Sequence, residues 1–295
     1  MRHKMYMPHV YKFLVMSLRV ALIYSFLIIG LTYLFNQIPL SDVLEVYFDL
    51  QKAELIENIL FFIFLSCCTL YIIKRFNIPI YFLDKNAIFK IHYFIPVILF
   101  FLIFSGVFSN FYLLDENFLR KPVNLLYTLE EFLGAAFEEI LFRGFVLGIL
   151  LLSLYNENMG LIKAIVISGL LFGLTHIINL KTFEGNNIGN VFNQVYGTAS
   201  IGIMWACVYY KTRSLLVLVL IHFANNFFAG LEAFLSMPLE QISNASESVK
   251  STSNYIISEV IRVIIFGLPA VLGFMILFIP SDQDNIKWRL KLERK

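Results

Sequence analysis

Charged residues and cysteines are scarce in this sequence. Charged side chains make up 15% of the 295 residues, against about 25% in a soluble globular domain. The 3 cysteines, Cys67, Cys68 and Cys207, form no C-x-x-C pair and lie in apolar runs, so we expect them to be buried packing residues. The net charge is only +2, and we expect no nucleic-acid partner. An ordinary soluble domain is therefore disfavoured.

Apolar residues are abundant and occur in long runs. They make up 59% of the chain, with 31 Phe and 15 Tyr. Because a transmembrane helix needs about 20 apolar residues, the runs predict an all-α, polytopic membrane bundle of about eight transmembrane helices. No repeat, low-complexity tract or linker divides the chain, so residues 1–295 are interpreted as a single membrane domain. The runs are Phe13–Phe35, Leu55–Ile73, His92–Phe108, Leu129–Tyr155, Leu161–Ile178, Val191–Tyr210, Leu215–Phe234 and Tyr255–Ile279.

Basic residues fall mainly in alternate loops, and this pattern sets the predicted orientation. Lysine and arginine in short loops mark the cytoplasmic side of a membrane protein. The pattern predicts a multi-pass cell-membrane protein with both termini cytoplasmic, with Arg120 and Lys121 as the exception. The many Phe, Ile, Asn and Lys residues favour a bacterial source. The residues that follow the pattern include Lys12, Lys74, Arg75, Lys85, Lys90, Lys211, Arg213, Lys287 and Arg289.

Several polar residues interrupt the apolar runs. The bilayer core penalises an intramembrane charge by about 2.5–3.5 kcal/mol, so such residues usually face the bundle interior and serve a function. Six of them stand out, on three of the predicted spans: Glu138, Glu139 and Arg143 on the fourth, His176 on the fifth, and His222 and Asn226 on the seventh.

Helix geometry suggests different roles for these residues. Glu139 and Arg143 are four positions apart with the acid first, which favours an ion pair on one helix face. Glu138 points about 100° away and lacks that partner, so it is the better candidate for a general base. His176 and His222 could bind a water or hold a developing oxyanion, with Asn226 as a further donor.

A structural role is the alternative for these six residues, because a Glu–Arg pair can simply hold helices together. One pair would suffice for that, whereas here two carboxylates and two histidines lie on three helices. A functional site is therefore favoured. Glu130 and Glu131 lie at the start of the fourth run, where the helix dipole favours acids. We expect them to form a solvated helix entrance, with lining of the cavity mouth as the alternative.

Three motifs give the sequence a resemblance to a known family. "EEILFRG" matches E-E-x-x-x-R-G, "FGLTH" matches F-x-x-x-H, and "HFANN" matches H-x-x-x-N, in that order. Together they resemble the CPBP family, the CAAX-prenyl-protease and bacteriocin-processing (Abi) group of intramembrane proteases. The resemblance implies a catalytic core region at residues 129–234 and hydrolysis of a peptide bond, by glutamate-activated water, in an intramembrane polar cavity. H-E-x-x-H, G-x-S-G and G-x-G-D motifs are absent, which disfavours other membrane proteases.

The resemblance leaves the cofactor open, because the family is described both as glutamate-dependent and as metal-dependent. Zinc, if bound, would take its ligands from Glu138, His176 and His222. We favour a metal-free mechanism, because these residues do not form a compact ligand motif.

The expected substrate is a hydrophobic peptide or lipidated protein in the lipid bilayer. In bacteria, relatives resemble processors of bacteriocin or signal peptides, or immunity factors. A non-catalytic regulator or scaffold of the same fold, with a membrane sensor kinase as partner, is one alternative. A proton-coupled transporter is another, but the inverted repeats or broken helices that are frequent in transporters are not evident in the sequence.

Overall fold

A computed structural model describes residues 40–83, 90, 92–104, 110–114, 118–154, 157–177, 188–236 and 252–279, with positions 19, 20, 23, 24, 27, 30 and 31. Within these residues the chain is helical and contains no strand, which confirms the all-α prediction. The first predicted run lies largely outside the described residues. Both termini lie entirely outside them, so their cytoplasmic placement stays a prediction.

The helices follow one another closely along the chain. They are α2 (Leu40–Leu44), α3 (Leu50–Arg75), α4 (Ile95–Phe104), α6 (Pro122–Glu139), a π-helix (Ile140–Val146), α7 (Leu147–Leu154), α8 (Gly160–Thr175), α9 (Ile188–Thr212), α10 (Leu215–Ser236) and α11 (Thr252–Phe278). Short 3₁₀ turns at Phe111–Leu113 and Phe118–Arg120 precede α6.

Two helices of the described chain are long and apolar enough to cross a membrane, Leu50–Arg75 and Leu215–Leu235. Gly160–Thr175 and Val263–Phe278 are shorter apolar helices. The sixth predicted run, diluted by polar residues, is nonetheless helical over the 25 residues of α9. A membrane bundle fits these helices, and the total of about eight spans stays a prediction.

The outer face of α3 corrects the expectation that all three cysteines are buried. Cys207 is buried, but Cys68 is half-buried and Cys67 is exposed. Cys67 lies three residues after Phe64 and four before Tyr71, both exposed apolar side chains. At helical spacing these residues form one apolar surface, which suits contact with lipid and explains why a cysteine there need not be buried.

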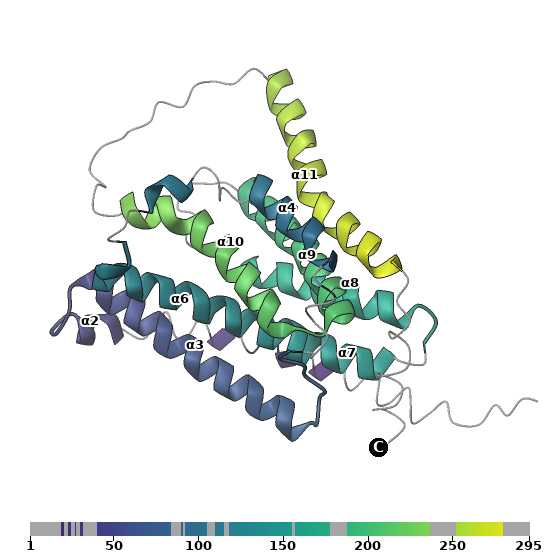
Figure 1. Ribbon diagram of the computed structural model, residues 1–295, viewed down its shortest axis with the longest axis horizontal. Coiled ribbons are helices and arrows are strands. Elements are labelled where there is room, and N and C mark those ends of the chain that lie inside the picture. The colour runs from purple at the N-terminus through teal and green to yellow at the C-terminus, as the bar shows by residue number, and fades with distance from the viewer. Residues whose placement is uncertain are drawn as a thin grey trace, which may run out of the picture.

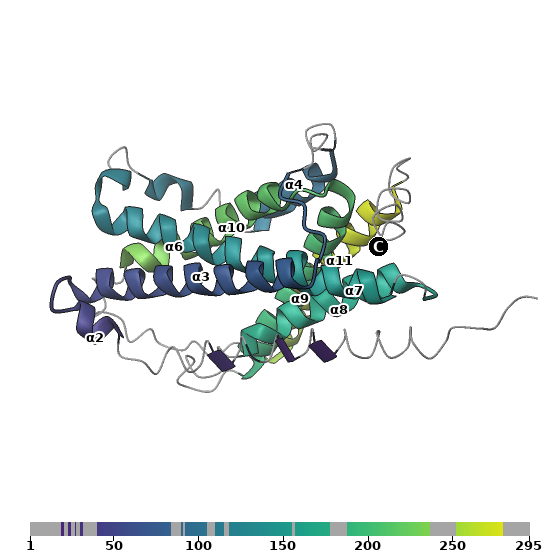
Figure 2. The ribbon, with the colours of Figure 1, turned by 90° about the horizontal axis from the view of Figure 1, so that it is seen from below.

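The bundle is organised around α6, which packs against α3 on one side and α10 on the other. The views in Figures 1 and 2 both show α3, α6 and α10 running side by side. The Tyr127 hydroxyl of α6 donates to the Phe227 carbonyl of α10 at 2.9 Å, five residues after His222 on the same helix. In a second group of helices, α9 packs against both α8 and α11.

Glycines allow α8 and α9 to approach each other closely. A β-carbon at Gly173 would lie 2.5 Å from the Val195 carbonyl oxygen, and one at Gly202 would lie 3.0 Å from the Cα atom of Gly169. Larger residues at these positions would push the helices apart. Small residues at helix contacts are typical of membrane bundles, where packing holds the helices together.

The start of α6 corrects the interpretation of Glu130 and Glu131. The helix begins at Pro122, a residue favoured in the first helical turn, well before the predicted start at Leu129. The two acids therefore lie in mid-helix, and the solvated-entrance prediction is wrong. Glu130 instead accepts a hydrogen bond from Nδ2 of Asn58 on α3 at 2.7 Å.

Candidate active site

A π-helix interrupts the helix that carries the two adjacent glutamates. It follows Glu139 directly, and the Leu147 amide donates to the Phe142 carbonyl five residues earlier. The same carbonyl accepts a hydrogen bond from the Ser168 hydroxyl of α8 at 3.2 Å. Every residue of the π-helix is buried, including Arg143. Short π-helical segments are rare and occur often at functional sites.

Glu139 is the centre of the buried polar cluster. Its side chain is 0% exposed, and its Oε2 lies 3.2 Å from Nε of Arg143, as the four-residue spacing predicts. The two atoms form an ion pair outside hydrogen-bond geometry, and Nη1 of Arg143 has no hydrogen-bond partner among the described residues. Nη2 of Arg143 lies 3.4 Å from the Gly202 carbonyl oxygen. Two buried charges are thus held mainly by each other.

His222 joins the two glutamates, a relationship that the sequence does not predict. Its Nδ1 donates to Oε1 of Glu139 at 2.8 Å, while its Nε2 lies 3.5 Å from Oε2 of Glu138. The Glu138 side chain is 29% exposed, against 0% for Glu139. The adjacent acids therefore have different surroundings, and only Glu138 has a surface that a water or substrate can reach.

The ring of Phe172 connects the histidines and the arginine. It lies edge-on to His176 at 5.3 Å and edge-on to His222 at 6.1 Å. The Arg143 guanidinium lies over its face, 4.6 Å from the ring centre. Such cation–π contact stabilises a buried cation. Phe172 and His176 therefore share one helix face, as their spacing predicts.

His176 has its own backbone contact and lies at the end of α8. Its Nδ1 lies 3.1 Å from the Phe172 carbonyl oxygen, a contact in which a ring N–H donates to the carbonyl. Any catalytic role of this ring therefore falls to Nε2. The ring of Phe172 contacts the rings of both His176 and His222.

Asn226 follows His222 by one helical turn on α10. Its Oδ1 accepts a hydrogen bond from Nδ2 of Asn225 at 3.2 Å. Its own amide nitrogen is thus oriented as a donor, since the oxygen is already engaged. Asn226 is half-buried, so a substrate can reach that donor.

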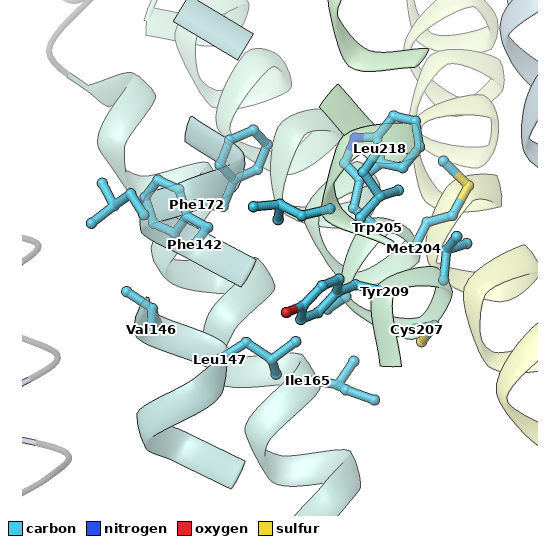
Figure 3. Packing of buried hydrophobic residues seen from close by; sticks show 14 of the residues in the cluster. Phe142, Val146, Leu147, Ile165, Phe172, Met204, Trp205, Cys207, Tyr209 and Leu218 are labelled. Atoms are coloured by element: carbon cyan, nitrogen blue, oxygen red, sulfur yellow. The ribbon is translucent and has the colours of Figure 1, made fainter. Parts of the chain in front are cut away.

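One face of α9 completes the cluster, and sequence reasoning missed it. Gly202 accepts from Arg143, and Trp205, three residues later, stacks on His222 at 6.1 Å with 26° between the rings. Figure 3 shows Trp205 and Tyr209 in the packed region that also holds Phe142 and Phe172. The spacing of Gly202, Trp205 and Tyr209 places them on one helix face, but it does not show that this face meets His222.

The residues proposed as zinc ligands do not converge. Among the described residues, no group of three His, Cys, Asp or Glu side chains is arranged to hold a metal ion. His222 is engaged by both glutamates, and Nδ1 of His176 faces a backbone carbonyl. The donor set does not fit a zinc site, and no step below is derived through a metal.

Comparison with known families identifies the central region. Residues 122–228 match the family model described as type II CAAX prenyl endopeptidase Rce1-like. The match begins at the first residue of α6 and includes all six candidate site residues. No curated protein and no solved structure matches the chain. The match confirms the resemblance to the CPBP family.

Proposed function

From the match of residues 122–228 to the Rce1-like type II CAAX prenyl endopeptidase family model, we propose that the chain is an intramembrane endopeptidase that uses Glu138 to activate water. The family is membrane-embedded, and the two long apolar helices fit that location. The observation that carries the proposal is the contrast between the two acids: Glu138 is partly exposed beside His222, whereas Glu139 is fully buried between His222 and Arg143.

The reaction requires a base that reaches the water and a donor that reaches the carbonyl. Glu138 takes a proton from water, and the water oxygen bonds to the carbonyl carbon of the peptide bond. The electron pair of the carbonyl moves to its oxygen, which Asn226 stabilises as a donor. Nε2 of His176 is an acceptor, because Nδ1 donates to the Phe172 carbonyl, and it positions the attacking water. The tetrahedral species then collapses, the C–N bond breaks, and Glu138 returns its proton to the leaving nitrogen. The products are one carboxyl and one amino terminus.

Glu139 and Arg143 support this chemistry without touching the substrate. The 2.8 Å hydrogen bond from Nδ1 of His222 to Glu139 orients the ring, and Nε2 is thereby directed to Glu138. Arg143 balances the charge of Glu139 in the fully buried part of the cluster. Two fully buried charges arranged in this way are costly unless paired, which supports a functional reason for their presence.

A hydrophobic or lipidated peptide is the substrate that this location favours. A peptide held in the bilayer reaches Glu138 from the apolar surroundings of α6 and α10. In a bacterial cell membrane such a substrate could be a bacteriocin or signal peptide, with peptide processing or immunity as the biological role. The absence of turnover on every such peptide would favour the regulator or scaffold instead.

The test is direct cleavage by the purified full-length protein in lipid vesicles. Two reporter peptides of identical sequence, one prenylated at a cysteine near its C-terminus and one not, are incubated with it, and fragments are identified by mass spectrometry. We expect a defined cut that requires Glu138. A well-folded protein that cuts neither peptide, nor any hydrophobic transmembrane reporter, would contradict the proposed peptidase function.

A further inference from the structure

The indole of Trp205 is the largest side chain that is completely buried in the described structure. It lies outside the three motifs that carry the family resemblance. Its ring stacks on His222 at 6.1 Å and on Phe101 of α4 at 5.1 Å, with interplanar angles of 26° and 14°. Rings at these separations are within the range of favourable aromatic contact. Trp205 therefore links a catalytic candidate to the apolar core.

Two aromatic side chains define the plane of the His222 ring. Trp205 presents its face to that ring, while Phe172 meets it at 82°, close to perpendicular. Rotation of the imidazole about its bond to Cβ would break the stack with Trp205 and drive the ring toward Phe172. The same rotation would withdraw Nδ1 from Glu139 and Nε2 from Glu138. One orientation satisfies all four contacts.

We propose that Trp205 is a positioning residue that fixes the His222 ring so that it faces both glutamates, an inference that rests on the proposed peptidase function. Glu139 alone cannot do this, because one hydrogen bond to Nδ1 leaves the ring free to tilt about that bond. The stacked indole removes that freedom. A misplacement of about 1 Å at a catalytic group can cost roughly 100-fold in rate, so a rigid platform has a kinetic consequence.

The contact acts through the ring face and not through the indole N–H. Nε1 of Trp205 is buried and has no hydrogen-bond partner among the described residues. An indole chosen for its N–H would be expected to use it, since buried tryptophans usually find a partner. Phenylalanine should therefore replace tryptophan in this role, whereas leucine, which has no flat face, should not.

The neighbouring residue Met204 offers a matched control for loss of packing. It is as fully buried as Trp205 but lies toward α11: a β-carbon on Gly273 of that helix would lie 2.7 Å from the Met204 Cα atom. Figure 3 shows Met204 on the side of the yellow α11 ribbon. Truncation of Met204 creates a cavity in the same helical turn without touching His222.

The experiment compares Trp205→Leu, Trp205→Phe and Met204→Ala in the full-length protein. We expect Trp205→Leu to lower kcat about 10- to 100-fold with little change in KM, because the substrate contacts remain. Trp205→Phe should retain most of kcat, and Met204→Ala should lose stability but keep kcat. In a His222→Ala background, Trp205→Leu should have no further effect on kcat, because it acts only through that ring.

A second measurement does not depend on turnover. In protein labelled with ¹⁵N-histidine, the ring signals of His222, assigned with His222→Gln, should be sharp in the parent and in Trp205→Phe but exchange-broadened or shifted in Trp205→Leu. Unchanged His222 signals and normal kcat in Trp205→Leu would overturn the proposal, as would a Trp205→Phe variant as impaired as Trp205→Leu. Lack of cleavage by the parent, by contrast, would count against the peptidase function and leave the NMR result to decide the role of Trp205.

Discussion

Nε of Arg143 lies 3.2 Å from Oε2 of Glu139, and neither side chain is more than 1% exposed. Glu139 is the last α-helical residue of α6, and Arg143 lies in the π-helix that follows. Arg143 also reaches across to α8 and α9, through the face of Phe172 and the carbonyl of Gly202. This one pair therefore ties three helices to the candidate active site.

Arg143→Ala should destabilise the protein strongly. Removal of one partner of a buried ion pair leaves an uncompensated charge on Glu139, and such changes typically cost about 3–5 kcal/mol. Arg143→Lys should recover only part of the loss, because lysine lacks the planar guanidinium that lies over Phe172. Thermal unfolding in detergent measures the difference.

The exposed ion pair between Lys163 and Glu157 supplies the control for this substitution. Its atoms lie 2.8 Å apart and the Lys163 side chain is 49% exposed. Lys163→Ala should therefore change stability by no more than about 0.5 kcal/mol. If Arg143→Ala proves as harmless as Lys163→Ala, the central role of the pair is wrong.

Helical periodicity predicted local relationships in this chain, and it failed where distant helices meet. The spacing of Glu139 and Arg143 was enough to predict their pairing, and the spacing of Phe172 and His176 their ring contact. The hydrogen bond between His222 and Glu139 joins residues 83 positions apart, so no local pattern reports it.

The start of α6 and the role of Trp205 were not predicted from the sequence. The helix start at Pro122 was missed because Asn124 and Thr128 dilute the apolar run before Leu129, although Asn124 is buried and its amide caps the Phe118 carbonyl at 3.0 Å. Trp205 resembles an ordinary core residue in the sequence, because nothing there shows which ring it faces. The helix start involves a local hydrogen bond that the apolar pattern does not report, whereas the position of Trp205 depends on tertiary contacts, which a single sequence does not encode locally.

Glu138→Gln and Glu139→Gln should separate chemistry from support. Loss of a general base typically lowers the rate about 10²- to 10⁴-fold, so Glu138→Gln should lose turnover and unfold at the parent temperature. Glu139→Gln leaves Arg143 buried without an anion and should lose both turnover and stability. Cleavage assays and thermal melts on the same preparations measure both quantities. Normal cleavage by a folded Glu138→Gln protein would rule out the proposed base.

The two histidines should also behave differently. His176→Ala and His222→Ala should each reduce turnover about 10²- to 10³-fold, because each positions a group that acts on the reacting carbonyl. Only His222→Ala should also lower thermal stability, because it removes the hydrogen bond to the fully buried Glu139. The double variant should be little slower than the worse single variant, since the residues act on one step. Equal melting temperatures for both single variants would contradict this difference.

Removal of metal ions should leave activity intact. Among the described residues, no three His, Cys, Asp or Glu side chains are arranged to hold a metal ion, so Glu138, His176 and His222 do not form a ligand set. Dialysis against a strong chelator, followed by metal analysis of the protein, should give unchanged cleavage rates. Inhibition that zinc alone reverses would instead recast these three residues as candidate ligands.

Gly202→Ala should disturb the candidate active site through the contact between α9 and α8. A β-carbon at this position would lie 2.9 Å from the Phe172 ring and 3.0 Å from the Gly169 Cα atom, so the ring or the helices must shift. Overpacking of this kind typically costs about 1–3 kcal/mol. Because Phe172 touches Arg143, His176 and His222, turnover should fall as well.

Gly197 on the same helix is the matched control: a β-carbon there would lie 3.4 Å from the Phe266 ring, an ordinary contact. Alanine is favoured over glycine inside a helix by about 0.5–1 kcal/mol, so Gly197→Ala should be neutral or stabilising and fully active. In thermal melts and cleavage assays, Gly202→Ala should therefore unfold at a lower temperature and cleave more slowly than the parent, whereas Gly197→Ala should do neither. Equal behaviour would show that the close approach of α8 and α9 does not constrain the active site.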